Sequence, residues 1–302
     1  MKKEIDKMKR FIFLLFISFI LMNCTSKNNE IKIIKNSDYE LKIAPNQQAI
    51  LVLFPCFSCD ITHTTTEAFF LKNIEQKGIS TLILNYNQKL FLTSTEMNEI
   101  QQLLNNIFEQ YQLSKENIIF GGFSSGGNIA LLSANHFIKE GQSIQPNGLF
   151  VVDSPLDLEE LYKSAQKDIK ENINQDAVNE GNFLVNLFNQ TLGNPADSIQ
   201  NYQEFSPYLI SSNSTRNIEY LTKINIRFYS EPDLDWQKEN RNRTYEDLNA
   251  YKLEKTTKAL KKLGSKNIEF IITQQRGIRA NGEKHPHSWN LVEQKSLIDW
   301  IL

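Results

Sequence analysis

Apolar stretches of two kinds alternate along most of this chain. Short continuous runs, typical of strands buried on both faces of a sheet, occupy residues 39–43, 49–54, 79–84, 117–120, 148–153, 224–229 and 268–273. Segments with helical patterns lie between them at 64–76, 93–112, 128–140 and 245–263, and a last helix ends at residue 302. Strands that alternate with helices predict an α/β fold with a doubly wound, mostly parallel sheet.

Residues 154–222 interrupt this alternation. They contain helix-like pieces around 156–169 and 182–192 and a loop-like Ser206-Pro207-Tyr208. We interpret the segment as a helical lid inserted over the C-terminal edge of the sheet, where ligands bind in such folds. The alternative, an independent helical domain, agrees less well with the low apolar content of the segment.

The first 24 residues have the pattern of an export signal. Residues 1–10 carry five Lys/Arg and two acids, residues 11–22 are almost wholly apolar, and Cys24 follows. Leu21-Met22-Asn23-Cys24 resembles the lipobox of bacterial lipoproteins, in which the cysteine is acylated and becomes the new N-terminus. The resemblance implies a signal peptide over 1–23, lipidation of Cys24 and a location in the bacterial cell envelope, facing the periplasm or the cell surface.

The polar, Lys/Asn-rich residues 24–36 would then be a tether, and residues 37–302 the folded domain. A transmembrane anchor is the alternative for the first segment, although twelve apolar residues are short for a bilayer. Cleavage before Cys24 would leave 28 basic and 33 acidic residues, a net charge of −5. A mildly acidic chain gives no reason to expect nucleic acid as a partner.

The sequence Gly122-Phe123-Ser124-Ser125-Gly126 fits the G-x-S-x-G pattern. It follows an apolar run and precedes a helical one, so it predicts a strand, a tight turn and a helix. A serine on such a turn has a strained backbone, and glycines on both sides relieve the crowding. The helix behind the turn directs its N–H groups at any anion that forms there. A Gly/Ser-rich turn without catalysis is the alternative.

A serine nucleophile needs a base, and the base needs an acid that orients it. Of the four histidines, His285 and His287 lie in the predicted loop between the last strand and the final helix, from which a side chain can reach the serine. We choose His287, at the entrance of the helix, and keep His285 as the alternative. A solvated loop without catalysis would also account for both.

Several carboxylates follow the predicted strands. Asp233 lies one turn beyond the strand at 224–229 and is our choice for the orienting acid. Asp235 and Glu231 in the same turn are rivals, and Asp153, at the end of the preceding strand, is another.

The order Ser124, Asp233, His287, with the serine in G-x-S-x-G between a strand and a helix, resembles the α/β-hydrolase superfamily over residues 39–302. The resemblance implies that Ser124 is the nucleophile, that His287 is the general base and that Asp233 holds the imidazole. It also implies oxyanion donors at the N–H of Ser125 and at that of Cys56 or Phe57. The expected activity is hydrolysis of a small-molecule carboxylic ester through an acyl-enzyme, by an enzyme anchored to a membrane.

Other functions stay open at this point. A serine peptidase could use the same three residues, and a binding lipoprotein could keep the fold without catalysis. Cys56-Phe57-Ser58-Cys59 between a strand and a helix resembles the thioredoxin active site, which implies redox chemistry. Otherwise the two cysteines form a short disulfide or remain as buried thiols. With no phosphate-binding loop and no clustered metal ligands in the sequence, we predict no cofactor and no metal.

Overall fold

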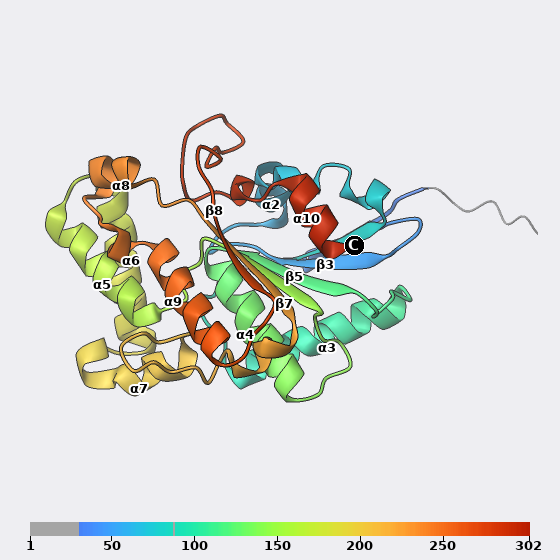
Figure 1. The fold of residues 1–302 in the computed structure, drawn as a ribbon, viewed down its shortest axis with the longest axis horizontal. Coiled ribbons are helices and arrows are strands. Elements are labelled where there is room, and N and C mark those ends of the chain that lie inside the picture. The colour runs from blue at the N-terminus through green and yellow to red at the C-terminus, as the bar shows by residue number, and fades with distance from the viewer. Residues whose placement is uncertain (1–29, 87) are drawn as a thin grey trace, which may run out of the picture. The chain divides into compact units, whose positions relative to one another are not determined.

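An eight-stranded sheet is the framework of the chain (Figure 1). The structure is a computed structural model and describes residues 30–86 and 88–302. Residues 31–302 form one compact unit. The strand order is β1-β2-β4-β3-β5-β6-β7-β8, in which β3 to β8 run parallel and β1 and β2 pair antiparallel. The predicted doubly wound, mostly parallel sheet is confirmed.

The strands are β1 (Lys32–Lys35), β2 (Tyr39–Ile43), β3 (Ala49–Phe54), β4 (Ile79–Leu84), β5 (Ile118–Phe123), β6 (Gly148–Val152), β7 (Asn225–Ser230) and β8 (Ile268–Ile272). The helices are α2 (Ile61–Glu67), α3 (Ser94–Gln110), α4 (Ser125–Lys139), α5 (Leu158–Glu171), α6 (Gln175–Thr191), α7 (Pro195–Phe205), α8 (Leu234–Arg241), α9 (Asn249–Lys262) and α10 (Gln294–Ile301). Strands β3, β4, β5 and β6 are buried at every position, as their continuous apolar runs predict.

Helices cover both faces of the sheet (Figure 1). On one face, α3, α4 and α9 enclose the larger apolar core, to which Leu104, Phe137 and Leu260 contribute. On the other face, α2, α10 and the turns between α2 and β4 enclose a second core around Phe70 and Trp289. Together the two cores hold the sheet rigidly, so the C-terminal ends of its parallel strands make a fixed edge on which side chains can be positioned.

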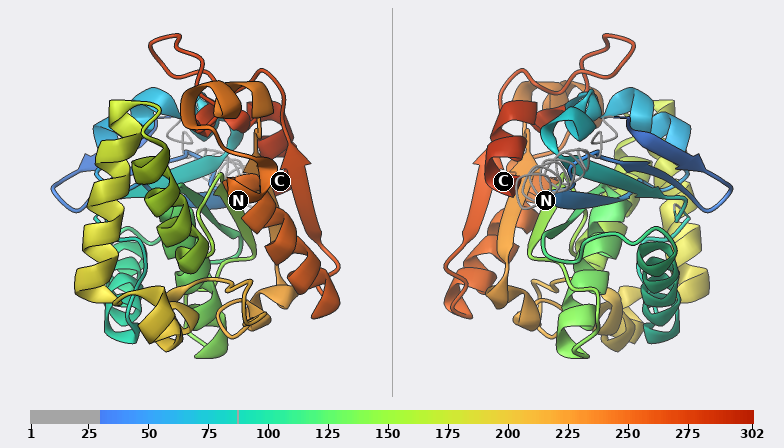
Figure 2. Two further views of the ribbon diagram at one scale, coloured as in Figure 1. Left: turned by 90° about the vertical axis from the view of Figure 1, so that its left-hand side faces the viewer. Right: turned by 90° about the vertical axis from the view of Figure 1, so that its right-hand side faces the viewer.

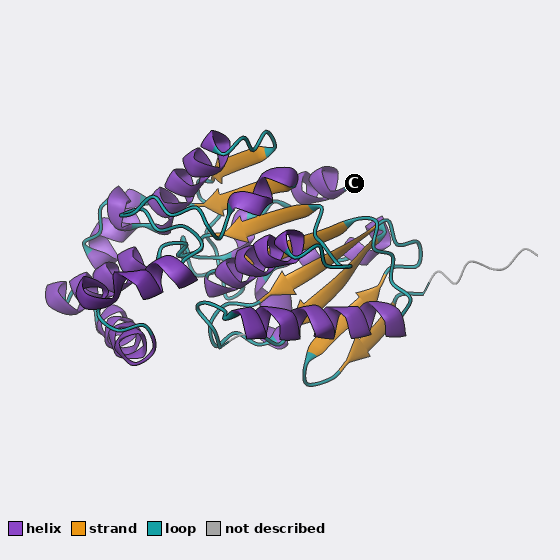
Figure 3. Cartoon of the chain, turned by 90° about the horizontal axis from the view of Figure 1, so that it is seen from below, coloured by secondary structure: helices purple, strands orange, loops and turns teal. Residues whose placement is uncertain are grey.

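The predicted insertion contains α5, α6 and α7, which lie beyond the edge toward which the parallel strands point (Figure 3). Helices α5 and α6 run side by side there (Figure 2). The helices share a small core of their own around Tyr162, Phe188 and Tyr202, and that core includes Leu90, from the segment between β4 and α3. The insertion is thus packed onto the rest of the domain.

Several boundaries differ from those predicted. Lys32–Lys35 forms β1, which shortens the predicted tether. The predicted helix over 64–76 is instead α2 followed by two short 3₁₀ turns. Helices α7 and α8 were not predicted, because α7 is short and kinked at Ser198 and α8 has no buried side chain.

The predicted signal peptide, Cys24 and the tether up to residue 29 lie outside the described residues. Among the residues that are described, no helix is both long and apolar enough to cross a membrane.

Candidate active site

Ser124 lies in the turn that joins β5 to α4. Its backbone has φ 54° and ψ −128°, a conformation that costs energy for a residue with a Cβ. The two glycines of the motif permit the turn, since a Cβ on Gly122 would lie 2.2 Å from the carbonyl oxygen of Gly126, and one on Gly126 would lie 2.0 Å from that of Phe54. The Ser124 N–H donates to the Val152 carbonyl at 2.9 Å. The predicted strand, tight turn and helix are confirmed.

His287 is held by a carboxylate. Its Nδ1 lies 2.6 Å from Oδ2 of Asp153, and because a carboxylate only accepts, the proton of the imidazole belongs on Nδ1. The ring of His287 also packs against that of Phe123, with 4.5 Å between centroids. These two contacts fix the orientation of the imidazole and leave Nε2 as the nitrogen that can accept a proton.

Asp153 follows β6 directly and is itself held in place. Its Oδ1 accepts a hydrogen bond from the Ser230 hydroxyl at 2.5 Å. Its backbone has φ 44°, its N–H donates to the Tyr229 carbonyl at 2.8 Å, and its carbonyl accepts from the Asn249 amide at 2.9 Å. The carboxylate therefore has one oxygen on the imidazole and the other on β7.

The prediction that Asp233 orients His287 is wrong, because the carboxylate that contacts the imidazole is Asp153. Asp233 begins α8, where its side chain accepts from the backbone N–H of Trp236 at 3.3 Å, and it also forms an ion pair with Lys284 at 2.5 Å. A carboxylate at the start of a helix is stabilised by the free N–H groups there. Asp233 thus stabilises local structure instead.

The other two acids of that turn do not reach His287 either. Asp235 is exposed in the first turn of α8. Glu231 is 4% exposed, and it accepts hydrogen bonds from the Thr273 hydroxyl and from the backbone N–H groups of Arg276 and Gly277. The Glu231 carboxylate therefore anchors the start of the loop that carries His287.

His285 supports this loop from a different position. Its Nδ1 accepts the backbone N–H of His287 at 3.2 Å, and its ring packs against Trp236 with 4.8 Å between centroids. Burial, with the nearby Arg279 guanidinium as a second cause, lowers the pKa of His285 to about 4. A neutral imidazole suits the acceptor role of Nδ1, so His285 positions the chain at His287.

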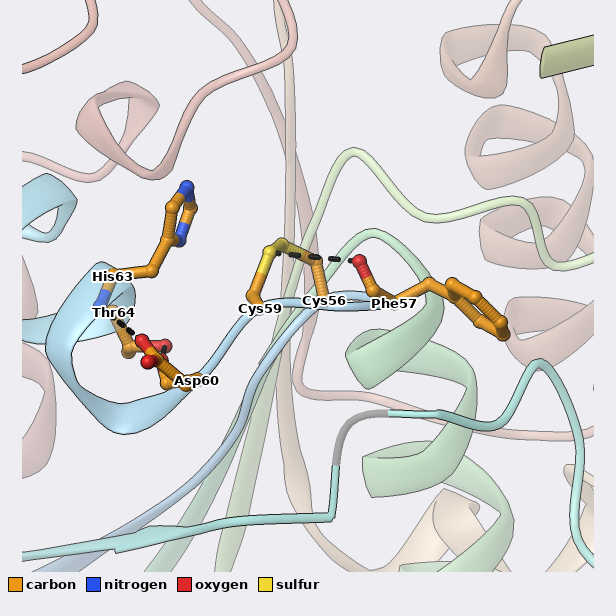
Figure 4. The surroundings of a disulfide bond; sticks show 6 residues. All are labelled: Cys56, Phe57, Cys59, Asp60, His63 and Thr64. Carbon is orange, nitrogen blue, oxygen red and sulfur yellow. Dashed lines mark hydrogen bonds between the residues drawn. A yellow bond between two sulfur atoms is a disulfide. The ribbon is translucent and has the colours of Figure 1, made fainter. Parts of the chain in front are cut away.

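The predicted oxyanion donors lie around Ser124. Ser125 is the first residue of α4, so its N–H is at the positive end of the helix. Cys56 and Phe57 follow β3, and no backbone hydrogen bond within the described part of the chain uses the N–H of either. A disulfide joins Cys56 to Cys59 (Figure 4), which decides between the two states that the sequence left open for this pair.

Ser124, Asp153 and His287 line one cavity of about 510 Å³ at the C-terminal edge of the sheet. One side of the cavity is apolar and includes Phe57, Leu161 and Phe183, of which the last two come from α5 and α6. The polar side of the lining is formed mainly by the turn after β7, by α8 and by the loop after β8. Within the described residues, no hydrogen bond joins the Ser124 hydroxyl to His287. Such contacts in unliganded enzymes often tighten only when substrate binds.

Ion pairs between partly buried arginines and acids of α5 and α6 connect the insertion to α8 and to the segment after it. Arg241 lies 3.1 Å from the Asp168 carboxylate on α5 and 2.7 Å from that of Glu180 on α6. Arg243 also bonds to Asp168, whose side chain is 2% exposed. Removal of one partner of a buried pair leaves an uncompensated charge, so these contacts fix the insertion where it helps to form the cavity.

Sequence reasoning missed Ser230, Asn249 and Phe123 as partners of the site. Ser230 was visible as the residue after a buried strand, but its contact with Asp153 depends on the pairing of Val152 with Tyr229 between β6 and β7. For a metal, the described residues offer one group of ligating side chains within reach of one another, made of Cys56, Cys59 and His63.

Three solved structures show what this fold is similar to. An esterase from the bacterial hormone-sensitive lipase (HSL) family has a TM-score of 0.55 at 12% identity, covering 91% of this chain and 83% of that one. MPT51 (FbpC1) of Mycobacterium tuberculosis has a TM-score of 0.53 at 11% identity, covering 91% and 96%. EstE5, solved after soaking with p-nitrophenyl butyrate, has a TM-score of 0.53 at 15% identity, covering 92% and 85%.

The chain has the α/β-hydrolase fold. No family model matches its sequence, and no curated protein does. A thioredoxin-like fold does not fit the eight-stranded sheet, so the resemblance of the Cys56-Phe57-Ser58-Cys59 segment to the thioredoxin active site does not extend to the fold.

Proposed function

We propose that this protein is a serine hydrolase that cleaves carboxylic esters. The observation that carries the proposal is the combination of Ser124 on a strained strand-to-helix turn with a His287–Asp153 hydrogen bond on the same cavity. The strained backbone at Ser124 costs stability, and the three side chains together supply a nucleophile, a base and an orienting acid.

In the proposed reaction, the Ser124 hydroxyl attacks the ester carbonyl while Nε2 of His287 takes its proton. The Asp153 carboxylate stabilises the imidazolium that forms and keeps Nδ1 as the donor. The negative oxygen of the tetrahedral intermediate accepts hydrogen bonds from the N–H of Ser125 and from that of Cys56 or Phe57. His287 then returns the proton to the leaving alcohol. In the second half of the reaction, water attacks the acyl-enzyme while His287 takes its proton, and His287 returns that proton to Ser124 as the acid leaves.

The shape of the cavity supports an apolar acyl group. Phe57, Leu161 and Phe183 line the same cavity as Ser124 and the predicted oxyanion donors, and the rings of Phe57 and Phe183 are in edge contact with 5.3 Å between centroids. Phe183 remains 46% exposed, so an acyl chain that covers it would remove apolar surface from water. The leaving alcohol would lie on the polar side, within reach of His287.

The predicted lipid anchor remains part of the proposal. Its support is the sequence of the first 24 residues, with a basic start, an apolar stretch and Cys24. Metabolic labelling with a fatty acid analogue should mark the wild-type protein in bacteria and not Cys24→Ser. Labelling of Cys24→Ser to the same extent would contradict the lipidation site.

The hydrolase itself is tested by labelling the purified protein with a fluorophosphonate probe, beside Ser124→Ala and Ser125→Ala. Ser125 is a matched control, because it is the neighbouring serine and its buried hydroxyl has no hydrogen-bond partner among the described residues. We expect the wild type and Ser125→Ala to be labelled, with the adduct on Ser124, and Ser124→Ala to stay unlabelled. Absence of label on folded wild-type protein would contradict the proposed mechanism.

A further inference from the structure

A second group of reactive side chains lies in the wall of the cavity. Cys56 and Cys59 come from the loop after β3, and His63 comes from the first turns of α2 (Figure 4). One ligand atom from each of the three lies within 4.8 Å of the other two. All three residues also line the cavity, so a ligand bound to them would be in contact with its solvent.

Local backbone structure brings the three side chains together. The N–H of Cys59 donates to the carbonyl of Cys56 at 3.0 Å, which closes a tight turn, and Ser58 within that turn has φ 61°. Asp60 then caps α2 by accepting the N–H of His63 at 2.6 Å. His63 is therefore held in the first turn of α2, four residues after Cys59. Its side chain extends on the side where the two sulfurs lie (Figure 4).

Within the described part of the chain, the imidazole of His63 is not engaged elsewhere. No hydrogen bond or ion pair among residues 30–86 and 88–302 engages its ring, which is exposed, whereas both cysteines are buried at 8% exposure. Two thiolates and an imidazole, with the cysteines separated by two residues, are a ligand set that Zn²⁺ prefers. A disulfide and a metal exclude one another at this place, because the metal needs both sulfurs as thiolates.

We propose that Cys56, Cys59 and His63 form a redox-controlled site for Zn²⁺. A dithiol or a phosphine breaks the disulfide by supplying two electrons, and each sulfur takes up one proton to become a thiol. Binding of Zn²⁺ then releases these two protons, and the metal is held by two thiolates and the His63 imidazole. A water molecule or a group in the cavity completes the tetrahedral coordination. The argument for this site does not rest on the proposed hydrolase activity, although the three residues line the same cavity as Ser124.

Cobalt(II) is a suitable probe, since it occupies tetrahedral zinc sites and absorbs visible light there. The protein is prepared in a Cys24→Ser background, which leaves Cys56 and Cys59 as the remaining two of the three cysteines, and it is reduced anaerobically with a phosphine. We expect one cobalt per chain, with a thiolate charge-transfer band and tetrahedral d–d bands that Zn²⁺ abolishes. The same protein left oxidised should show none of these bands.

Variants distinguish the three-residue site from cobalt bound to the cysteines alone. His63→Ala should weaken cobalt binding by about 10-fold or more, because the loss of a residue that only supports a metal ligand already costs about 10- to 100-fold. His136→Ala is the matched control, because His136 is bonded to Asn98 away from the cavity, and it should bind as the wild type does. Reduced protein without a thiolate–cobalt band, or a His63→Ala variant with wild-type affinity and spectrum, would overturn the site.

Discussion

Two neighbouring strands of the sheet end in carboxylates, and the two ends serve different purposes. After β6, Asp153 directs its carboxylate across the sheet edge to His287 and Ser230. After β7, Glu231 and Asp233 bond to the backbone of the loop after β8 and of α8. One strand end positions a reactive side chain, whereas the other stabilises the segments around it.

Distance along the sequence from a strand end therefore does not decide which acid contacts the imidazole. The loop after β8 returns over the sheet edge. The Glu231 carboxylate holds the start of that loop by accepting hydrogen bonds from its backbone. His287 then lies above the end of β6, within 2.6 Å of Asp153. Glu231 thus supports the loop that carries His287 without contacting the imidazole.

Loss of the proposed base, His287, should have the largest effect of all. His287→Ala should lower kcat for an ester roughly a millionfold, because removal of the base costs about as much as removal of the nucleophile. Rates are compared at saturating substrate with those of His136→Ala, which should match the wild type. A His287→Ala variant with more than residual activity would show that another group takes the proton.

The role of Glu231 is tested by stability. Glu231→Gln should lower the free energy of unfolding by about 1.5–3 kcal/mol, since buried hydrogen bonds to a charged group are lost. The measurement is denaturant unfolding, with Glu269→Gln as the control. Glu269 is 54% exposed and paired to Arg227, so its substitution should cost about 0–1 kcal/mol. Equal effects would contradict the anchoring role of Glu231.

A smaller effect is expected at Asp233. Asp233→Ala removes the cap of α8 and should lower stability by about 0.5–2 kcal/mol. We expect kcat to stay within about twofold of the wild-type value, because the contacts of the Asp233 side chain are to Trp236 and Lys284 and not to His287. Asp235→Ala removes an exposed acid of the same turn and should change stability less. A large fall in kcat with normal stability would restore Asp233 as a candidate for the acid.

A further prediction concerns the pH dependence of stability contributed by His285. Burial lowers its pKa from 6.5 to about 4, so the unfolded chain takes up the proton first as the pH falls. The contribution of the neutral His285 imidazole to stability is complete above pH 6.5 and is lost as the pH falls toward about 4. The difference in unfolding free energy between the wild type and His285→Asn should change in this window. Parallel pH curves for the two proteins would contradict the buried, neutral state.

The sequence predicted most of the framework, because β3 to β6 are fully buried and their composition shows it. The elbow was predictable for a similar reason, since only glycine fits where Gly122 meets Gly126. Helix α8 was missed because its stability comes from the Asp233 cap and from the ion pairs of Arg241, and an apolar face is absent from its sequence.

The acid could not be chosen from the sequence. Asp153 and Asp233 both follow apolar strands, and a capped turn explained Asp153 equally well. The choice depends on which strands are neighbours and on the path of the loop after β8, and neither is encoded near the residue itself. A positive φ at Asp153, which turns the chain at the end of β6, is likewise visible only in the structure.

The most direct test compares kcat for one ester with an apolar acyl group between Asp153→Asn and Asp233→Asn. These are two isosteric substitutions that follow neighbouring strands. We expect Asp153→Asn to lose about 10⁴-fold, because asparagine would hold His287 in the wrong tautomer, and Asp233→Asn to keep its rate. Loss of activity in Asp233→Asn with a normal rate in Asp153→Asn would contradict the assignment of Asp153.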